Sequence, residues 1–124
     1  FIGEVYDPNQ YRLYVASGFD YLYDKVGMYD CVRGVICDER PASSITQEWQ
    51  KVDDIRDHML YFLENHDEQR IASDFFAANP WKAIPGMIVS ALLQQNPVMV
   101  YAGQEFGEKG MDKEGFSGCD GNYL

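Results

Sequence analysis

The chain has 124 residues, 46% of them apolar, which is enough for one domain with a buried core. Its 20 acidic and 10 basic side chains give a formal net charge of -10, and acids and bases are interspersed. Such a surface repels phosphate backbones, so we expect no nucleic acid partner. The longest apolar run, at 83–93, is interrupted by Pro85 and Gly86 and falls short of the ~20 residues of a membrane helix. We therefore expect a soluble domain without a membrane partner.

Two further features bear on the context of the domain. The cysteines are odd in number, and their spacings fit neither a disulfide framework nor a zinc site, so we interpret Cys31, Cys37 and Cys119 as free thiols. Phe1 lies directly inside an apolar strand pattern with no leading cap or signal, which predicts that the chain is a fragment. Neither feature indicates a cellular compartment.

Apolar runs of strand length alternate with segments of helical periodicity, which is typical of a parallel sheet with crossover helices. The residues after Gly103 are rich in glycine and polar side chains, which predicts a loop. In chain order, the sequence predicts a strand over 1–6, a helix over 8–17, a strand over 19–23, helices over 25–39 and 44–53, a strand over 59–63, helices over 67–76 and 81–95, and a strand over 98–102.

Polar side chains gather where three of the predicted strands end. Glu4 lies within the first strand, residues 64–67 follow the strand at 59–63, and Glu105 follows the last strand. In parallel sheets, residues just past the carboxyl ends of strands face the ligand crevice. For Glu105 and Glu108 a solvated loop role is the more common outcome, whereas a carboxylate inside a strand, such as Glu4, favours a functional role.

Glycoside hydrolysis requires two carboxylates in one ligand crevice. One protonates the leaving oxygen, and the other stabilises or traps the oxocarbenium ion. Three motifs stand in order along the chain: "FIGEVYDP" at 1–8, "FLENHD" at 62–67 and "VYAGQEFG" at 100–107. With these motifs the chain resembles the alpha-amylase family of glycoside hydrolases across essentially its whole length. The motifs resemble those of the family's fifth, seventh and eighth barrel strands.

The resemblance implies a retaining hydrolase of alpha-glucans or alpha-glucosides, such as starch or maltooligosaccharides, with Glu4 as general acid/base. It implies that Asp67 is the carboxylate that stabilises the transition state, and that His66 donates to the same sugar. Tyr6 either stacks on a neighbouring sugar or has a structural role in packing within the protein. The exact substrate, and the choice between hydrolysis and transglycosylation, stay open.

The roles of two nearby charged residues, Arg70 and Glu64, stay open. Arg70 lies three residues beyond Asp67, and it either binds substrate or pairs with Glu64 or Glu68. Glu64 stands where many members of the family carry a different acid, so the resemblance assigns it no role.

The same resemblance implies a fold: the C-terminal half of a (β/α)8 barrel, strands five to eight, over residues 1–124. The family's nucleophile lies on the fourth strand, so we expect the isolated chain to be inactive. Any calcium site of the family would also lie upstream, so no cofactor is expected in this chain, and calcium stays open for the complete enzyme. A half barrel has two open edges, and we expect it to self-associate.

Three other functions are alternatives to this one. A catalytically inert relative of the barrel, kept as a binding or partner scaffold, would usually have lost its carboxylates. A phosphate site on the glycines after 102 would face repulsion from the neighbouring Glu105 and Glu108. A metal site formed by His58, His66 and Asp67 would need residues from opposite ends of one strand.

The barrel also predicts a geometry. Glu4 and Asp67 should lie at the same end of one parallel sheet, with His66 on the same rim. Two strand spacings, shortened by side chains that lean inward, give an expected separation of roughly 5 to 10 Å.

Overall fold

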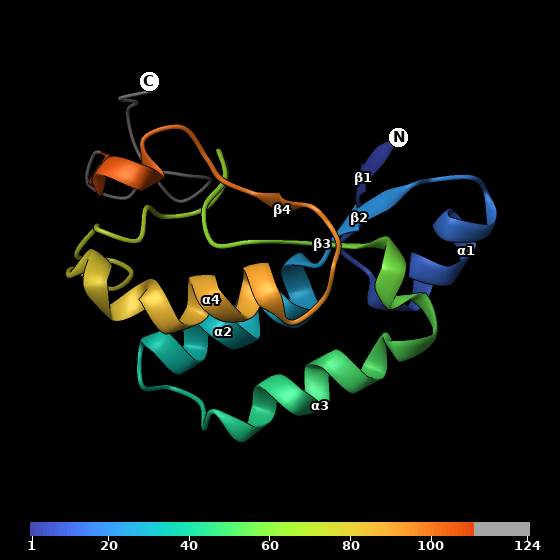
Figure 1. Cartoon of the computed structure of the whole chain (residues 1–124), viewed down its shortest axis with the longest axis horizontal. Helices are drawn as coiled ribbons and strands as arrows, with labels where there is room; N and C mark the ends of the chain where they lie inside the picture. The colour runs from blue at the N-terminus through green and yellow to red at the C-terminus, as the bar shows by residue number, and fades with distance from the viewer. Residues whose placement is uncertain (111–124) are drawn as a thin grey trace.

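The computed structural model describes residues 1–110, which form an α/β fold around one four-stranded sheet (Figure 1). All neighbouring strands are parallel, and their order in the sheet is β1-β2-β3-β4, the same as in the sequence. Each strand lies within a predicted range and is shorter than predicted. The strands are β1 (Ile2–Glu4), β2 (Tyr21–Tyr23), β3 (Met59–Phe62) and β4 (Val98–Met99).

Helices connect consecutive strands, as the alternating pattern predicted. No helix in the described part of the chain is both long and apolar enough to cross a bilayer. The helices are α1 (Tyr11–Ala16), which continues a 3-10 turn at Pro8–Gln10, α2 (Asp30–Ile36), which continues a π-helical turn at Lys25–Tyr29, α3 (Ser43–Lys51), and α4 (Ile84–Leu92), which continues a 3-10 turn at Pro80–Ala83. Two more 3-10 turns lie at Asp53–His58 and, in the segment predicted as loop, at Gln104–Phe106.

The helix predicted over 67–76 is wrong, because the structure has only turns and bends there. Side chains at the end of β3 bind the backbone amides that a helix would have used. The carboxylate of Glu64 accepts the Ile71 N–H at 2.7 Å, and Asn65 Oδ1 accepts the Asp67 N–H at 2.9 Å. Such contacts compete with hydrogen bonds to the carbonyl four residues back, so the segment folds as a loop.

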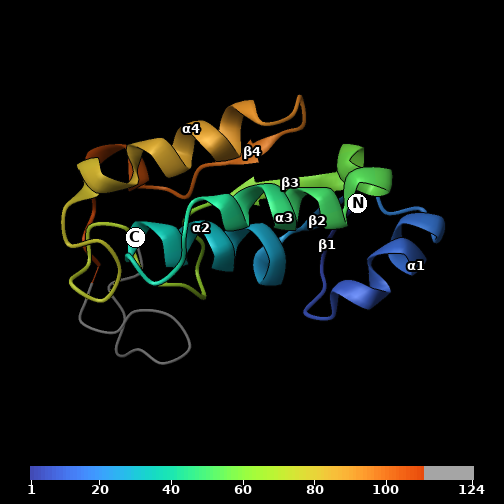
Figure 2. The same ribbon diagram turned by 90° about the horizontal axis from the view of Figure 1, so that it is seen from below.

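The strand register divides the sheet into two different faces. Leu22 and Met59 are register partners on one face, and both are fully buried. Glu4 and Tyr23 are partners on the other face, where Ile2 is 55% exposed. Figures 1 and 2 show α2, α3 and α4 together on one side of the strands. The sheet is therefore covered by helices on one side, and Glu4 belongs to the less covered face.

The helix layer packs closely at a glycine. A Cβ atom at Gly86 of α4 would come within 2.8 Å of side-chain carbons of both Val32 and Ile36 on α2. The absence of a side chain there lets α4 lie directly against α2. The outer face of α4 remains apolar and open, with Ile88 52% and Leu92 76% exposed.

Candidate active site

The carboxyl ends of the parallel strands form a rim that carries the predicted site residues. Glu4 is the last residue of β1, and Asp67 lies in the loop that follows β3. Because β1, β2 and β3 are parallel, these two acids follow the same end of one sheet, as expected. Glu4 is exposed, whereas the side chain of Asp67 is only 16% exposed.

Tyr6 connects the two acids electrostatically. Its hydroxyl donates to Glu4 Oε1 at 3.2 Å. The pKa of Tyr6 is raised, first by partial burial, then by the charge of Glu4 and the hydrogen bond to it, and then by the charges of Asp67 and Glu68. The hydroxyl of Tyr6 is therefore hydrogen-bonded to Glu4 and lies within the electrostatic influence of Asp67 and Glu68. The ring is 52% exposed and therefore available for stacking.

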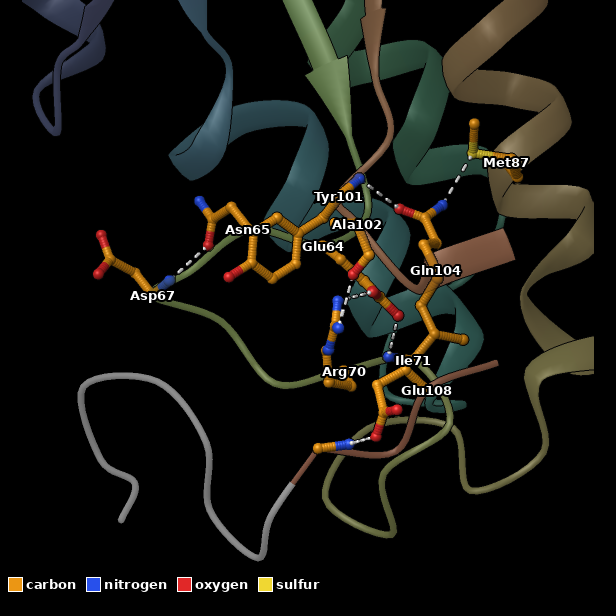
Figure 3. A network of polar contacts seen from close by, with 11 residues as sticks. Glu64, Asn65, Asp67, Arg70, Ile71, Met87, Tyr101, Ala102, Gln104 and Glu108 are labelled. Carbon is orange, nitrogen blue, oxygen red and sulfur yellow. Dashed lines mark hydrogen bonds and ion pairs between the residues drawn. The ribbon is translucent and has the colours of Figure 1, made fainter. Parts of the chain in front are cut away.

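His66 and Asp67 form a pair on this rim. His66 Nε2 lies 3.4 Å from Asp67 Oδ1, and the imidazole side chain is 68% exposed. The Asp67 backbone is fixed by Asn65, a buried residue whose side chain accepts the Asp67 N–H (Figure 3). This Asx turn directs the chain out of β3 and sets the position of Asp67. An Asn two residues before an acid is a local signal from which the turn could have been predicted.

The neighbouring acid Glu68 is held by the π-helical turn that follows β2. Lys25 Nζ lies 3.2 Å from Glu68 Oε1, and the hydroxyl of Tyr29 donates to Glu68 Oε2 at 3.2 Å. Burial lowers the pKa of Lys25, but Asp30 and Glu68 outweigh it and raise the pKa overall. The loop with Asp67 is therefore anchored from β2 as well as from β3. No local sequence signal indicated this contact, because it joins segments about 40 residues apart.

Arg70 lies under the rim rather than on its surface. Its side chain is 2% exposed, and one guanidinium nitrogen contacts Glu64 Oε2 at 2.8 Å while another donates to the Ala102 carbonyl at 2.7 Å (Figure 3). The guanidinium also lies over the Tyr101 ring, 4.5 Å from its centroid. Of the interpretations left open by the sequence, the structure therefore contains the pair with Glu64. This cluster joins the loop after β3 to the end of β4.

His58, His66 and Asp67 do not come together as a metal site. His58 ends the 3-10 turn before β3, and its Nδ1 lies 2.9 Å from the Asp20 carbonyl. Asp67 lies beyond the other end of that strand. Within residues 1–110 no three His, Cys, Asp or Glu side chains are placed to hold a metal ion.

Asp24 is a buried acid away from this rim. It lies directly after β2, on the opposite side of the strand from Tyr23. Burial raises its pKa from 3.8 to about 6, although the Met28 amide, the Tyr11 hydroxyl and the Gly27 amide each lower it. The folded chain thus keeps this proton at pH values where the unfolded chain has lost it. The stability that Asp24 contributes is present below about pH 4 and is lost as the pH rises through about 6.

We predict that this change amounts to roughly 3 kcal/mol between pH 4 and 7 at low salt. Acids with lowered pKa values, such as Asp54, contribute in the opposite direction, so the wild type must be compared with Asp24→Asn. Urea unfolding across this range should show the difference in free energy between the two proteins changing with pH. A constant difference would mean that Asp24 has an ordinary pKa.

In comparisons with known proteins, no family model, no curated protein and no solved structure matches the chain.

Proposed function

We propose that the chain is the C-terminal half of a (β/α)8 barrel of the alpha-amylase type, and that it contributes Glu4 and Asp67 to the active site of an alpha-glycoside hydrolase. The observation that carries the proposal is the common rim. Glu4 ends β1 and Asp67 follows β3 at the same end of the parallel sheet, the hydroxyl of Tyr6 donates to Glu4, and the three sequence motifs stand in the family's order.

In this proposal each residue of the rim has a role in the chemistry. Glu4 protonates the glycosidic oxygen and later takes a proton from water, while Asp67 binds hydroxyls of the sugar whose bond breaks. His66 donates to the same sugar, and Tyr6 offers a ring face beside it. The nucleophile comes from an upstream strand of the complete protein.

The incomplete coverage of the sheet supports the fold part of the proposal. β1 pairs only with β2, and β4 pairs only with β3, so both outer strands have an open edge among the described residues. Glu4 lies on the less covered face of the sheet, which is the face that would line the interior of a closed barrel.

The function is tested with the complete protein and a panel of glucans. We expect turnover of starch and maltooligosaccharides but not of beta-linked glucans, with large losses in Glu4→Gln and Asp67→Asn. Glu105→Gln, which changes an exposed acid after β4, is the matched control and should keep wild-type activity. Binding of glucans without turnover would favour the inert scaffold, and full activity in Glu4→Gln would refute the assignment.

The isolated 124-residue chain should not hydrolyse starch or aryl alpha-glucosides, because the nucleophile is absent from it. Product formation is measured against protein concentration with the purified chain. Turnover that scales with this concentration and disappears in Glu4→Gln would refute the division of the site between two halves.

The isolated chain should also self-associate, through its open strand edges and exposed apolar side chains. Large apolar residues are exposed near both edges: Phe1 and Ile2 at β1, Val100 after β4, and Ile88 and Leu92 on α4. Sedimentation velocity over a range of concentrations should show dimers or larger species. A monomer at high concentration that also melts cooperatively would contradict this expectation.

A further inference from the structure

The carboxylate of Asp67 has little to hold it directly. Among residues 1–110 its hydrogen-bond and ion-pair contacts are limited to His66, and the imidazole of His66 is 68% exposed. A partner that is largely exposed fixes the direction of a carboxylate only weakly. The direction of Asp67 is therefore set by the backbone on either side of it.

That backbone is supported from both directions. Before Asp67, the side chain of Asn65 accepts the Asp67 N–H. After it, the next residue, Glu68, is held from the π-helical turn that follows β2. Lys25 Nζ lies 3.2 Å from Glu68 Oε1, and the Tyr29 hydroxyl donates to Oε2 at 3.2 Å. Both carboxylate oxygens of Glu68 therefore have a partner.

The two residues that hold Glu68 are themselves fixed. The buried Tyr29 ring stacks on the Phe62 ring of β3, with centroids 4.9 Å apart and an interplanar angle of 9°. The Tyr29 amide donates to the Asp24 carbonyl at 2.9 Å, which ties the turn to the end of β2. Lys25 Nζ also lies 3.1 Å from Asp30 Oδ1, and the Lys25 side chain is only 20% exposed. Side chains locked in this way hold a neighbouring site precisely.

We propose that Lys25 and Tyr29 are positioning residues of the active site: they hold Glu68, and through it they set where the carboxylate of Asp67 meets the sugar. This inference rests on the proposed function, and it gives a role to the π-helical turn, which lies outside the three sequence motifs. Neither residue needs to touch the substrate. The effect passes through one peptide unit, because Glu68 directly follows Asp67.

The test measures the kinetics of two variants of the complete protein with an activated aryl alpha-glucoside. Lys25→Met removes the charge, whereas Tyr29→Phe removes the hydroxyl and keeps the ring stack. We expect kcat to fall by roughly 10- to 100-fold in Lys25→Met and by a smaller factor in Tyr29→Phe. KM should change little, since the contact of Asp67 is made mainly in the transition state. A higher KM with an unchanged kcat would contradict the proposal.

Two further variants are the matched controls and should keep the wild-type kcat. Lys51→Met breaks another lysine–glutamate pair, in which Lys51 Nζ lies 2.9 Å from Glu48 Oε1 on α3. Tyr61→Phe removes a buried hydroxyl that has no hydrogen-bond partner within residues 1–110. Losses in these controls as large as those in Lys25→Met and Tyr29→Phe would overturn the proposal.

A double-variant cycle separates positioning from a general loss of folded protein. In Asp67→Ala the carboxylate is absent, so Lys25→Met has nothing left to position and should lower kcat little further. A smaller folded fraction would instead lower kcat by the same factor with and without Asp67. Equal factors in the two backgrounds would therefore overturn the proposal. If Lys25→Met does not fold, the cycle is carried out with Tyr29→Phe.

Hydrogen exchange of the same variants gives a readout that does not depend on turnover. The backbone amides of residues 66–69 should exchange faster in Lys25→Met and Tyr29→Phe than in the wild type and the controls. Unchanged exchange would overturn the proposal even in a protein that hydrolyses glucans. If the wild type turns over no glucan, the proposed function fails, and exchange alone then decides whether Lys25 and Tyr29 hold the loop with Asp67.

Discussion

Replacing Glu4 by Gln in the complete protein is expected to slow cleavage of starch by roughly 10²- to 10⁴-fold, the usual contribution of general acid-base catalysis. The amide keeps the shape of the side chain but cannot supply the proton that an alkoxide leaving group needs. Aryl alpha-glucosides with good leaving groups need less of this protonation. Their glycosylation step, measured in single-turnover experiments, should therefore be slowed much less.

Asp67→Asn gives the contrasting pattern. In the proposed mechanism Asp67 binds the sugar ring whose bond is broken, so its loss should slow both kinds of substrate, whatever the leaving group. Similar losses for starch and activated glucosides in Glu4→Gln would show that Glu4 is not the acid. A leaving-group dependence in Asp67→Asn instead would exchange the two assignments.

The largest expected effect on stability comes from the buried pair of Glu64 and Arg70. Arg70→Met should destabilise the fold by roughly 3–5 kcal/mol, because it leaves the carboxylate of Glu64 buried without its guanidinium partner. The double variant Glu64→Gln, Arg70→Met removes both charges and should recover part of that loss. Urea unfolding with an unchanged m-value measures both differences.

An exposed ion pair provides the control for this prediction. Arg12 contacts Asp54 at 2.6 Å, but both side chains are at least half exposed, so Arg12→Met should cost far less stability than Arg70→Met. A cost for Arg70→Met as small as that for Arg12→Met would mean that the buried pair does not hold the loop after β3 to the end of β4.

The strands of this fold could be predicted from the sequence because their runs of apolar residues directly indicate which segments are buried. The run at 59–63 is apolar throughout, and β3 is buried at every position. The alternation of strands and helices was enough to predict a parallel sheet. From that sheet followed the placement of Glu4 and Asp67 at one end.

The segment between β3 and α4 could not be predicted, because its structure depends on long-range contacts. Glu64 binds the Ile71 amide, and Arg70 reaches the carbonyl of Ala102, 32 residues away. Local helix propensity at 67–76 carries no information on either contact. The anchoring of Glu68 by Lys25 and Tyr29 has the same origin. The Asx turn that sets Asp67 is local, by contrast, because Asn65 lies only two residues before it.

The central claim, that Glu4 is the acid/base of a retaining alpha-glycosidase, is tested most directly by chemical rescue of Glu4→Ala in the complete protein. With an activated alpha-glucoside the first step needs no acid, so the glycosyl-enzyme forms and then waits for a base-activated water. Azide needs no base and should attack this intermediate, which restores turnover and gives the alpha-glucosyl azide with retained configuration. No rescue by azide, or formation of the beta-glucosyl azide, would contradict the assignment of Glu4.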